Sequence, residues 1–192
     1  MKRVAIVLAA GSARRFGGDK LAALLDDEPL LHHAIRAARD APVERVVVVA
    51  RPGLDTGDWQ GAPRVETLLI DSEALSASLL TGLGAAGEAE QIFVFLGDMP
   101  LVPHGLAAEL AERIGDAFAV QPVHEDKPGH PVLLSHRAMR AAATLRGDEG
   151  LGRILRARDD VLHYPCADPH ILLDIDRRED LARIEAGTEK QS

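Results

Sequence analysis

The chain has 192 residues, of which 46% are hydrophobic and 27% charged, a composition typical of a globular protein with one buried core. Aromatic residues make up only 3% and the formal net charge is −8, which argues against nucleic acid as a partner. No apolar run reaches the roughly 20 residues of a membrane span, and the single cysteine, Cys166, excludes a disulfide framework. We therefore expect a cytoplasmic protein with no membrane partner, made of one domain over residues 1–188 and a disordered tail at 189–192.

The charge is unevenly distributed along the chain. The first 20 residues contain five cationic side chains and one aspartate, whereas the remainder is strongly acidic. A basic corner on an acidic protein favours a small anionic ligand at that corner. The cationic residues are Lys2, Arg3, Arg14, Arg15 and Lys20.

Strand-like and helix-like patterns alternate over the first 122 residues. Continuous apolar runs predict buried strands, and apolar residues at intervals of three and four predict helices. The expected strands are 3–8, 43–50, 64–70, 91–96 and 117–122; the expected helices are 30–38, 72–86, capped by Ser72, and 103–114. This alternation predicts an α/β fold with a doubly wound, mostly parallel, Rossmann-like sheet and helices on both faces.

The pattern is less regular after residue 122. We expect a loop at 124–128, a strand at 131–134, a helix capped by Ser135 and ending near 145, and a helix at 151–158. A last strand at 171–173 and a helix at 178–186 complete the prediction. In a parallel sheet, ligands lie beyond the carboxyl ends of the strands. The loops after Leu8 and Leu96 should therefore share one edge of the sheet.

The loop after the first strand has the composition of an anion-binding turn. Small residues and glycines let backbone N–H groups approach an anion, and Arg15 and Lys20 add positive charge. The segment 17–20 lacks the ending of a Walker A loop, and no glycine stands two residues after Gly11, as a dinucleotide fingerprint requires. On spacing alone, a phosphate-binding loop and an ordinary glycine-rich turn are equally compatible with this stretch.

A second motif, Gly97-Asp98-Met99-Pro100, follows the expected central strand. A carboxylate at the carboxyl end of such a strand is well placed to hold Mg²⁺ on phosphate oxygens. A turn or cap role for Asp98 is equally compatible with the residues alone. A rival zinc site at His163, Cys166, Asp168 and His170 fits no familiar ligand spacing.

With these residues in place, the chain resembles the MobA-like NTP transferases, which make sugar nucleotides and molybdenum dinucleotide cofactors. The entry motif of that family matches at Leu8, Ala9, Gly11, Arg15, Phe16, Gly17 and Lys20, whereas Ala13 replaces the usual serine. The resemblance implies a nucleotide-diphospho-sugar transferase-like fold. It also implies catalytic roles for Arg15, Lys20 and Asp98, with Arg15 and Lys20 holding the triphosphate.

The same resemblance assigns the remaining site residues. It implies a nucleotide site, an acceptor site and a metal site. The metal, Mg²⁺ or Mn²⁺, would be bound by Asp98 and Asp174, and Asp176 is the alternative to Asp174. The nucleotide residues are Leu8, Ala9, Ala10, Gly11, Arg15, Lys20, Ser76, Ser78 and Gly97; the acceptor residues are His130, Pro131, Gly147 and Asp148. Without the resemblance, surface serines, a loop histidine and helix caps would explain Ser76, Ser78, His130, Asp148 and Asp176 equally well.

The resemblance also narrows the reaction. The Leu-Ala-Ala-Gly start, the serine stretch and Gly147–Gly150 favour the cytidylyl branch, whereas Gly17-Gly18-Asp19-Lys20 leans toward the guanylyl branch. We expect transfer of CMP from CTP to a phosphate-bearing acceptor, molybdopterin, with release of pyrophosphate. A recipient molybdoenzyme is a candidate partner. The alternatives are a GTP-dependent or sugar- or alcohol-phosphate enzyme, and a non-catalytic cofactor-delivery module; a nicotinamide oxidoreductase is disfavoured by the missing glycine fingerprint.

Overall fold

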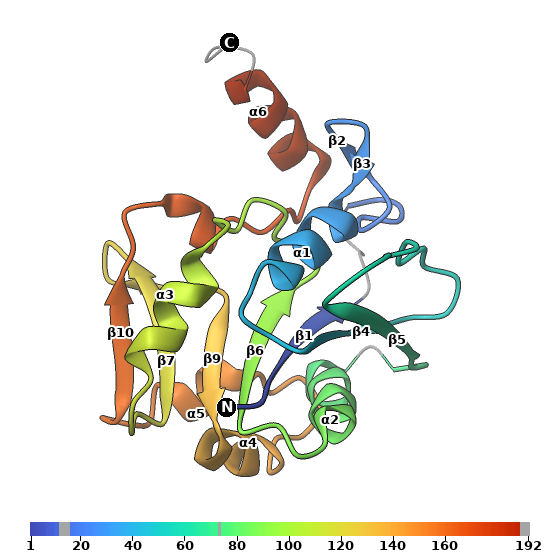
Figure 1. Ribbon diagram of the computed structural model, residues 1–192. Helices are drawn as coiled ribbons and strands as arrows, with labels where there is room; N and C mark the ends of the chain where they lie inside the picture. Colours follow the sequence, from blue (N-terminus) through green and yellow to red (C-terminus); the bar gives the residue numbers. More distant parts are fainter. Residues whose placement is uncertain (12–15, 73, 189–192) are drawn as a thin grey trace.

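The computed structural model describes residues 1–11, 16–72 and 74–188, and it contains one large mixed sheet between two layers of helices (Figure 1). The order across this eight-stranded sheet is β10-β7-β9-β6-β1-β4-β5, with β8 paired to β7. The strands are β1 (Arg3–Ala9), β4 (Arg45–Ala50), β5 (Arg64–Leu69), β6 (Gln91–Leu96), β7 (Ala119–His124), β8 (Lys127–Pro128), β9 (Val132–Ser135) and β10 (Val161–Pro165). A separate hairpin joins β2 (Leu24–Leu25) to β3 (Glu28–Pro29).

The helices divide between the two faces of the sheet. Helices α1 and α3 cover one face, and α2, α4 and α5 cover the other (Figure 1). Their bounds are α1 (Leu30–Arg39), α2 (Leu75–Ala86), α3 (Leu106–Arg113), α4 (His136–Ala142) and α5 (Leu151–Leu155), followed by a 3₁₀ helix, η1 (Pro169–Leu172), and α6 (Arg178–Thr188). None of the helices in the described part of the chain is both long and apolar enough to cross a membrane.

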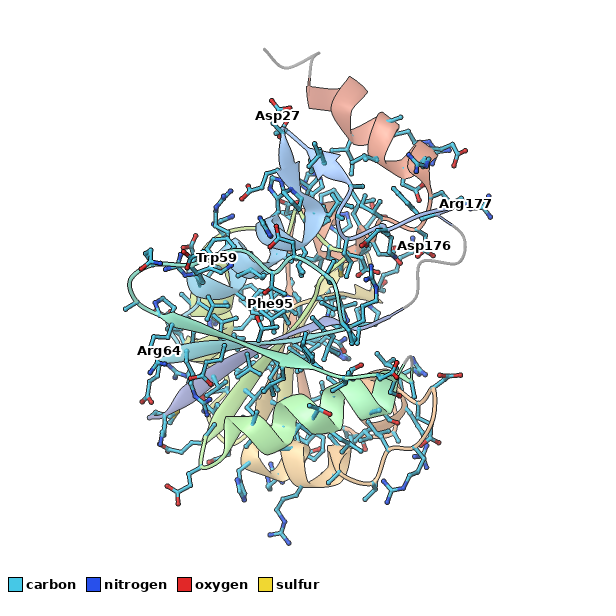
Figure 2. All side chains as sticks on the ribbon, turned by 90° about the vertical axis from the view of Figure 1, so that its right-hand side faces the viewer. Asp27, Trp59, Arg64, Phe95, Asp176 and Arg177 are labelled. Carbon is cyan, nitrogen blue, oxygen red and sulfur yellow. The ribbon has the colours of Figure 1, made fainter. Side chains whose placement is uncertain are left out.

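The alternation of side chains in β1 shows why the sheet is covered twice. Ala5 and Val7 point into the cluster beneath α1 and α3, whereas Val4 and Ile6 point into the cluster beneath α2 and α4, and all four are buried. Strands that are apolar on both faces require helices on both faces. Figure 2 shows Phe95 of β6 inside one of these layers.

The expected α/β fold is confirmed, with three corrections of detail. The sheet is mixed because β9 runs antiparallel to both β6 and β7. The expected strand at 171–173 is wrong: Ile171 is buried in η1, which begins where the Asp168 carboxylate accepts a hydrogen bond from the His170 N–H. Ser72 does not cap α2, because that helix begins at Leu75 and the Ser72 hydroxyl accepts a bond from the Ala74 N–H in the preceding turn.

Three further segments can be compared with what the sequence predicts. Strand β10 escapes sequence analysis because it pairs only with β7 at the edge of the sheet and alternates imperfectly. Ser135 caps α4 as expected, since its hydroxyl accepts a bond from the Ala138 N–H. The expected loop at 124–128 is instead a tight turn that pairs β7 with β8.

Candidate active site

The loop after β1 opens at the carboxyl edge of the sheet. Ala9 and Ala10 are buried, and Gly11 is exposed at the beginning of the loop. The chain is described again from Phe16, whose buried ring packs with Ile175 and lies beneath the Arg178 guanidinium at 5.1 Å. Two predictions fall outside the described residues: the triphosphate contact of Arg15, and the replacement of a serine by Ala13.

Among the described residues of this loop, Lys20 brings a positive charge to the carboxyl edge of the sheet. Its ammonium donates hydrogen bonds to Asp98 Oδ2 at 2.8 Å and to Asp176 Oδ1 at 3.1 Å. Burial alone would lower the pKa of Lys20, but the two carboxylates outweigh burial and raise that pKa above its ordinary value. Lys20 is therefore positively charged at neutral pH.

Asp98 reaches the same place from the end of β6. The Gly97 N–H donates to the Leu8 carbonyl at 2.9 Å, which ties the two loops together. A Cβ on Gly97 would lie 3.1 Å from that carbonyl oxygen, so glycine permits the close approach. The Asp98 carbonyl in turn accepts a bond from the Ile175 N–H at 2.9 Å, which brings the 174–176 segment alongside.

Three carboxylates therefore converge. One oxygen each from Asp98, Asp174 and Asp176 lies within 4.8 Å of the others, and Figure 2 shows Asp176 directed at the edge of the sheet while Arg177 projects away from it. Burial and the charges of Asp176 and Asp98 raise the pKa of Asp174. The three carboxylates repel one another and offer only oxygen atoms as ligands. This is the donor chemistry of a Mg²⁺ or Mn²⁺ site. The group that the sequence placed at Asp98 and Asp174 thus includes Asp176 as well.

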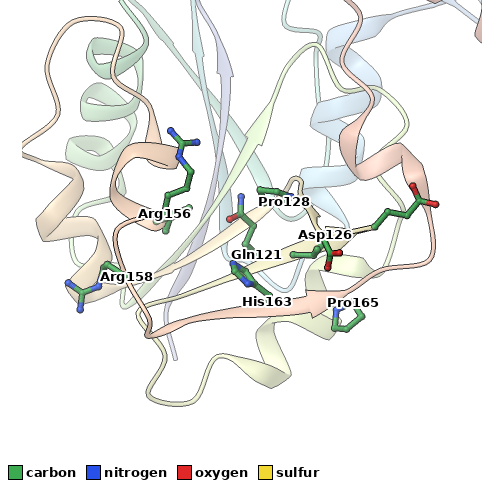
Figure 3. A pocket seen from close by; sticks show the side chains of 10 residues that line it. Gln121, Asp126, Pro128, Arg156, Arg158, His163 and Pro165 are labelled. Carbon is green, nitrogen blue, oxygen red and sulfur yellow. The ribbon is translucent and has the colours of Figure 1, made fainter.

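The rival zinc residues do not form such a group in the part of the chain that the structure describes. The His170 imidazole pairs with the Asp168 carboxylate at 2.8 Å, and the Cys166 thiol donates to the Asp168 carbonyl at 3.8 Å. His163 lines a cavity between β7, β8 and β10 instead (Figure 3).

A cavity of about 570 Å³ lies over Lys20 and Asp98. Most of the residues that sequence analysis assigned to the nucleotide line it, and so does Asp148, which was assigned to the acceptor. The lining residues are Leu8, Ala9, Ala10, Gly11, Lys20, Leu21, Leu75, Ser78, Leu96, Asp98, Asp148 and Asp176. The cavity has the size of a small-molecule site, and we call it the first cavity.

Ser76, Gly97 and Gly147 do not line the first cavity but hold its walls. The buried Ser76 donates its N–H to the Gly147 carbonyl at 3.1 Å, which joins α2 to the 147–150 segment. Ser78 lines the cavity, and its hydroxyl lies 3.5 Å from the Ala74 carbonyl in the preceding turn. Of the two serines, only Ser78 is therefore placed to contact a ligand there.

A second cavity, of about 290 Å³, adjoins the first and shares Leu8, Leu75 and Leu96 with it. His130 and Gly150 belong to its lining, whereas Pro131 and Gly147 do not. The position of His130 is fixed by its N–H, which donates to the Ile171 carbonyl at 2.9 Å, and by its ring Nδ1, which lies 3.4 Å from the Val94 carbonyl.

Acid should weaken the fold through His130. Burial lowers the pKa of His130 below its ordinary value of 6.5. As the pH falls below about 6.5, the unfolded chain therefore takes up a proton that the folded chain resists, and the free energy of unfolding decreases. Urea unfolding at pH 7.5 and pH 5.5 checks this: His130→Gln should lose less stability between the two pH values than the parent. Equal losses would mean that His130 does not contribute.

Gly129 packs closely against the backbone of η1. A Cβ there would lie 2.4 Å from the backbone oxygen of Ile171, and a backbone atom cannot move aside cheaply. Gly129→Ala should therefore lower the free energy of unfolding by roughly 1–3 kcal/mol, as overpacking does. Gly84→Ala, at a helical position with open space around it, is the matched control and should be neutral or stabilising by up to about 1 kcal/mol in the same urea titrations. Equal stabilities of the two variants would contradict the packing at Gly129.

Several residues that line these cavities were not predicted from the sequence. Gln121 stands in the apolar run of β7 as a buried polar residue, which was a usable signal. Leu75 begins the serine stretch on which the resemblance rests, but it was not assigned to a site. Arg156 carries no signal, because an arginine near a helix end is common in any protein.

Residues 5–161 match the MobA-like NTP transferase domain. The chain belongs to the MobA-like NTP transferase family. It is 26% identical to the molybdenum cofactor cytidylyltransferase of Escherichia coli over 91% of each chain, and 36% identical to a probable molybdenum cofactor guanylyltransferase of Pyrococcus furiosus over 52% of this chain. A solved homologue of Rv0371c from Mycobacterium sp. strain JC1 is 26% identical, with a TM-score of 0.84 and full coverage of both chains. The chain spans only about half or less of the length of several curated relatives that it matches. The Pyrococcus furiosus protein, of which it covers 48%, is one of them.

Proposed function

We propose that this member of the family transfers a nucleoside monophosphate from a nucleoside triphosphate to a phosphate-bearing acceptor and releases pyrophosphate. The observation that carries the proposal is the convergence of Lys20 with Asp98, Asp174 and Asp176 beside a cavity that the β1 loop lines. A fixed cation and a cluster of hard oxygen ligands at one sheet edge suit a substrate with several phosphates.

The reaction needs no enzyme nucleophile. An oxygen of the acceptor phosphate forms a bond to the α-phosphorus, the bond from that phosphorus to the bridging oxygen breaks, and pyrophosphate leaves with the electron pair. Catalysis is then positioning and charge stabilisation. Lys20, kept protonated by its carboxylates, offsets negative charge on the departing phosphates. Arg15 would assist Lys20 on the strength of the family motif.

The metal site consists of Asp98 with Asp174 and Asp176. A divalent cation there would neutralise phosphate charge during transfer. Mg²⁺ and Mn²⁺ both suit three carboxylates, and a solved structure of the same fold, Rv0371c of Mycobacterium tuberculosis, is a manganese complex.

CTP is the nucleotide we propose and molybdopterin the acceptor. The Leu-Ala-Ala-Gly start of the loop and the match over 91% of the Escherichia coli cytidylyltransferase support this choice. GTP is the second candidate, since the Pyrococcus guanylyltransferase has the higher identity over a shorter span. We further propose that residues 1–188 act as one cytoplasmic domain that passes its product to a recipient molybdoenzyme, without nucleic acid or membrane as partners.

The choice of base is tested by pyrophosphate release from ATP, CTP, GTP and UTP, each with Mg²⁺ and molybdopterin. We expect kcat/KM for CTP to exceed that for each of the other triphosphates at least tenfold. GTP as the best substrate would overturn the cytidylyl assignment but leave nucleotidyl transfer intact. Tight nucleotide binding without pyrophosphate release from any triphosphate would instead favour a non-catalytic delivery module.

A further inference from the structure

The described part of the β1 loop, residues 16–20, is held more firmly at one end than at the other. At the far end, Lys20 binds two carboxylates and Asp19 pairs with Arg51, which follows β4 directly. The two residues before Asp19 are exposed glycines and offer no side chain for an anchor. At the near end, the buried ring of Phe16 attaches the loop to the body of the protein. The position of the near end therefore depends on how firmly this ring is held.

Arg178 covers the near end of the loop from the first turn of α6. The central carbon of its guanidinium lies 5.1 Å from the centroid of the Phe16 ring. A Cβ on Gly18 would lie 3.3 Å from Nη2 of Arg178, so the same guanidinium also lies against the backbone of the loop. A cation within about 6 Å of the face of an aromatic ring is attracted by that ring. One exposed side chain of α6 thus packs against the loop at two points.

The beginning of α6 is held in a defined position. The Asp180 carboxylate accepts hydrogen bonds from the N–H groups of Asp176, at 3.2 Å, and of Arg177, at 2.8 Å. With the helix start fixed in this way, two consecutive arginines point in different directions. Arg178 lies over the Phe16 ring, whereas Arg177 projects away from the sheet edge (Figure 2). The pair therefore contains both the side chain of interest and a control of equal charge beside it.

The guanidinium of Arg178 has no acidic partner within the described ranges of the chain, where it makes neither a hydrogen bond nor an ion pair. Its charge is therefore not neutralised by a carboxylate. The Phe16 ring and the loop backbone are the neighbours that determine where the guanidinium lies. Arg178 consequently links the segment that carries Asp174 and Asp176 to the loop that carries Lys20.

This link bears on the binding of the nucleotide. The β1 loop lines the first cavity through Gly11 and Lys20, and the family motif implies a triphosphate contact by Arg15, which precedes Phe16 in the sequence. A loop that is already held in place loses less conformational freedom when a ligand binds. Lys20 keeps its own two carboxylate partners in the absence of Arg178. Loss of Arg178 should therefore weaken binding of the triphosphate and leave kcat nearly unchanged.

We propose that Arg178 is a positioning residue for the triphosphate, which acts by holding the Phe16 end of the β1 loop against α6. The inference rests on the proposed function, because the ligand of the loop is taken to be a nucleoside triphosphate. It adds to that function a residue from the C-terminal helix that contacts neither the metal nor the reacting atoms. The effect of Arg178 passes through the Phe16 ring.

The test combines calorimetry of CTP and of GTP in the presence of Mg²⁺, without an acceptor, with a pyrophosphate assay that gives KM and kcat separately. Arg178→Ala should raise Kd and KM about fivefold, which an exposed cation–π contact can account for, and should leave kcat within twofold. Arg178→Lys keeps the charge without the planar guanidinium and should bring Kd back to within about twofold of the parent. Using both nucleotides makes the result independent of the choice of base.

Arg177→Ala is the matched control, because it removes the same charge one residue away from a side chain that projects outward. It should leave Kd within twofold of the parent. An equal loss of affinity in Arg177→Ala and Arg178→Ala would show that only net charge matters and would overturn the proposal. An unchanged Kd in Arg178→Ala would also overturn it, and so would a lower kcat at constant KM.

A double-mutant cycle tests whether Arg178 acts through the ring. In a Phe16→Leu background, Arg178→Ala should change Kd by less than twofold, whereas a full fivefold loss there would mean that Arg178 acts on the triphosphate directly and would overturn the positioning role. Urea unfolding establishes that each variant is folded, and the comparison of Arg177→Ala with Arg178→Ala decides the matter if Phe16→Leu is not. A parent that binds nucleotide without transferring it would refute the proposed function alone, and a parent that binds neither nucleotide would refute both.

Discussion

Asp98→Asn should lower kcat for pyrophosphate release by about 10³-fold. The substitution keeps the size of the side chain but removes a negative charge from the carboxylate cluster and from the Lys20 ion pair. Loss of one preorganised electrostatic contact typically costs about 10²–10³-fold in kcat, and we expect the upper end because Asp98 serves both as a candidate metal ligand and as the partner of Lys20. The measurement is a pyrophosphate assay at saturating nucleotide, with thermal unfolding to establish that the variant is folded.

A surface aspartate supplies the control for this experiment. Asp116 is exposed in the turn before β7 and lines neither the first nor the second cavity, and Asp116→Asn makes the same chemical change there. It should leave kcat within a factor of two. A kcat for Asp98→Asn within tenfold of the parent would remove Asp98 from the reacting centre.

Lys20→Met should lower kcat by about 10²-fold or more and make the stability of the protein depend more strongly on Mg²⁺. Lys20 is the cation that bridges Asp98 and Asp176, at 2.8 and 3.1 Å. Without it, three carboxylates repel one another with no described cation between them, and the leaving phosphates lose a fixed positive charge. Added Mg²⁺ should therefore raise the melting temperature of Lys20→Met more than that of the parent.

Two further variants separate the contributions of charge and position. Lys20→Arg keeps the charge in a different geometry and should retain part of the activity. Lys127→Met removes an exposed lysine in β8 that lines neither the first nor the second cavity, so it should change neither kcat nor the response to Mg²⁺. Parental kcat in Lys20→Met, or a melting temperature that responds to Mg²⁺ as the parent's does, would contradict the role given to Lys20.

The first half of the fold could be predicted from sequence because its signals are local. The apolar runs at β1, β4 and β6 are buried on both faces. Such continuous runs are typical of parallel strands, so each of them predicts a parallel sheet without reference to the rest of the chain. The same reasoning placed Lys20 and Asp98, 78 residues apart, at one edge, and their side chains are in contact. The alternation of strands and helices is enough to predict which strand ends share this edge, because it implies a parallel sheet.

The second half could be predicted less well because its structure depends on distant partners. Strand β9 lies between β6 and β7 and runs antiparallel to both, which no local pattern reveals. Asp176 reaches Lys20 across 156 residues of sequence through the bond between Ile175 and Asp98, so the choice between Asp174 and Asp176 could not be made beforehand.

The most direct test of the account is the transfer itself. The protein is incubated with α-³²P-labelled CTP, molybdopterin and Mg²⁺, and the label is followed by thin-layer chromatography beside a pyrophosphate assay. We predict that label moves to the acceptor in equal amount with pyrophosphate, that EDTA stops both, and that Asp98→Asn shows neither. Label that stays in CTP while the nucleotide binds tightly, or transfer that continues at the same rate in EDTA, would contradict metal-assisted nucleotidyl transfer at this site.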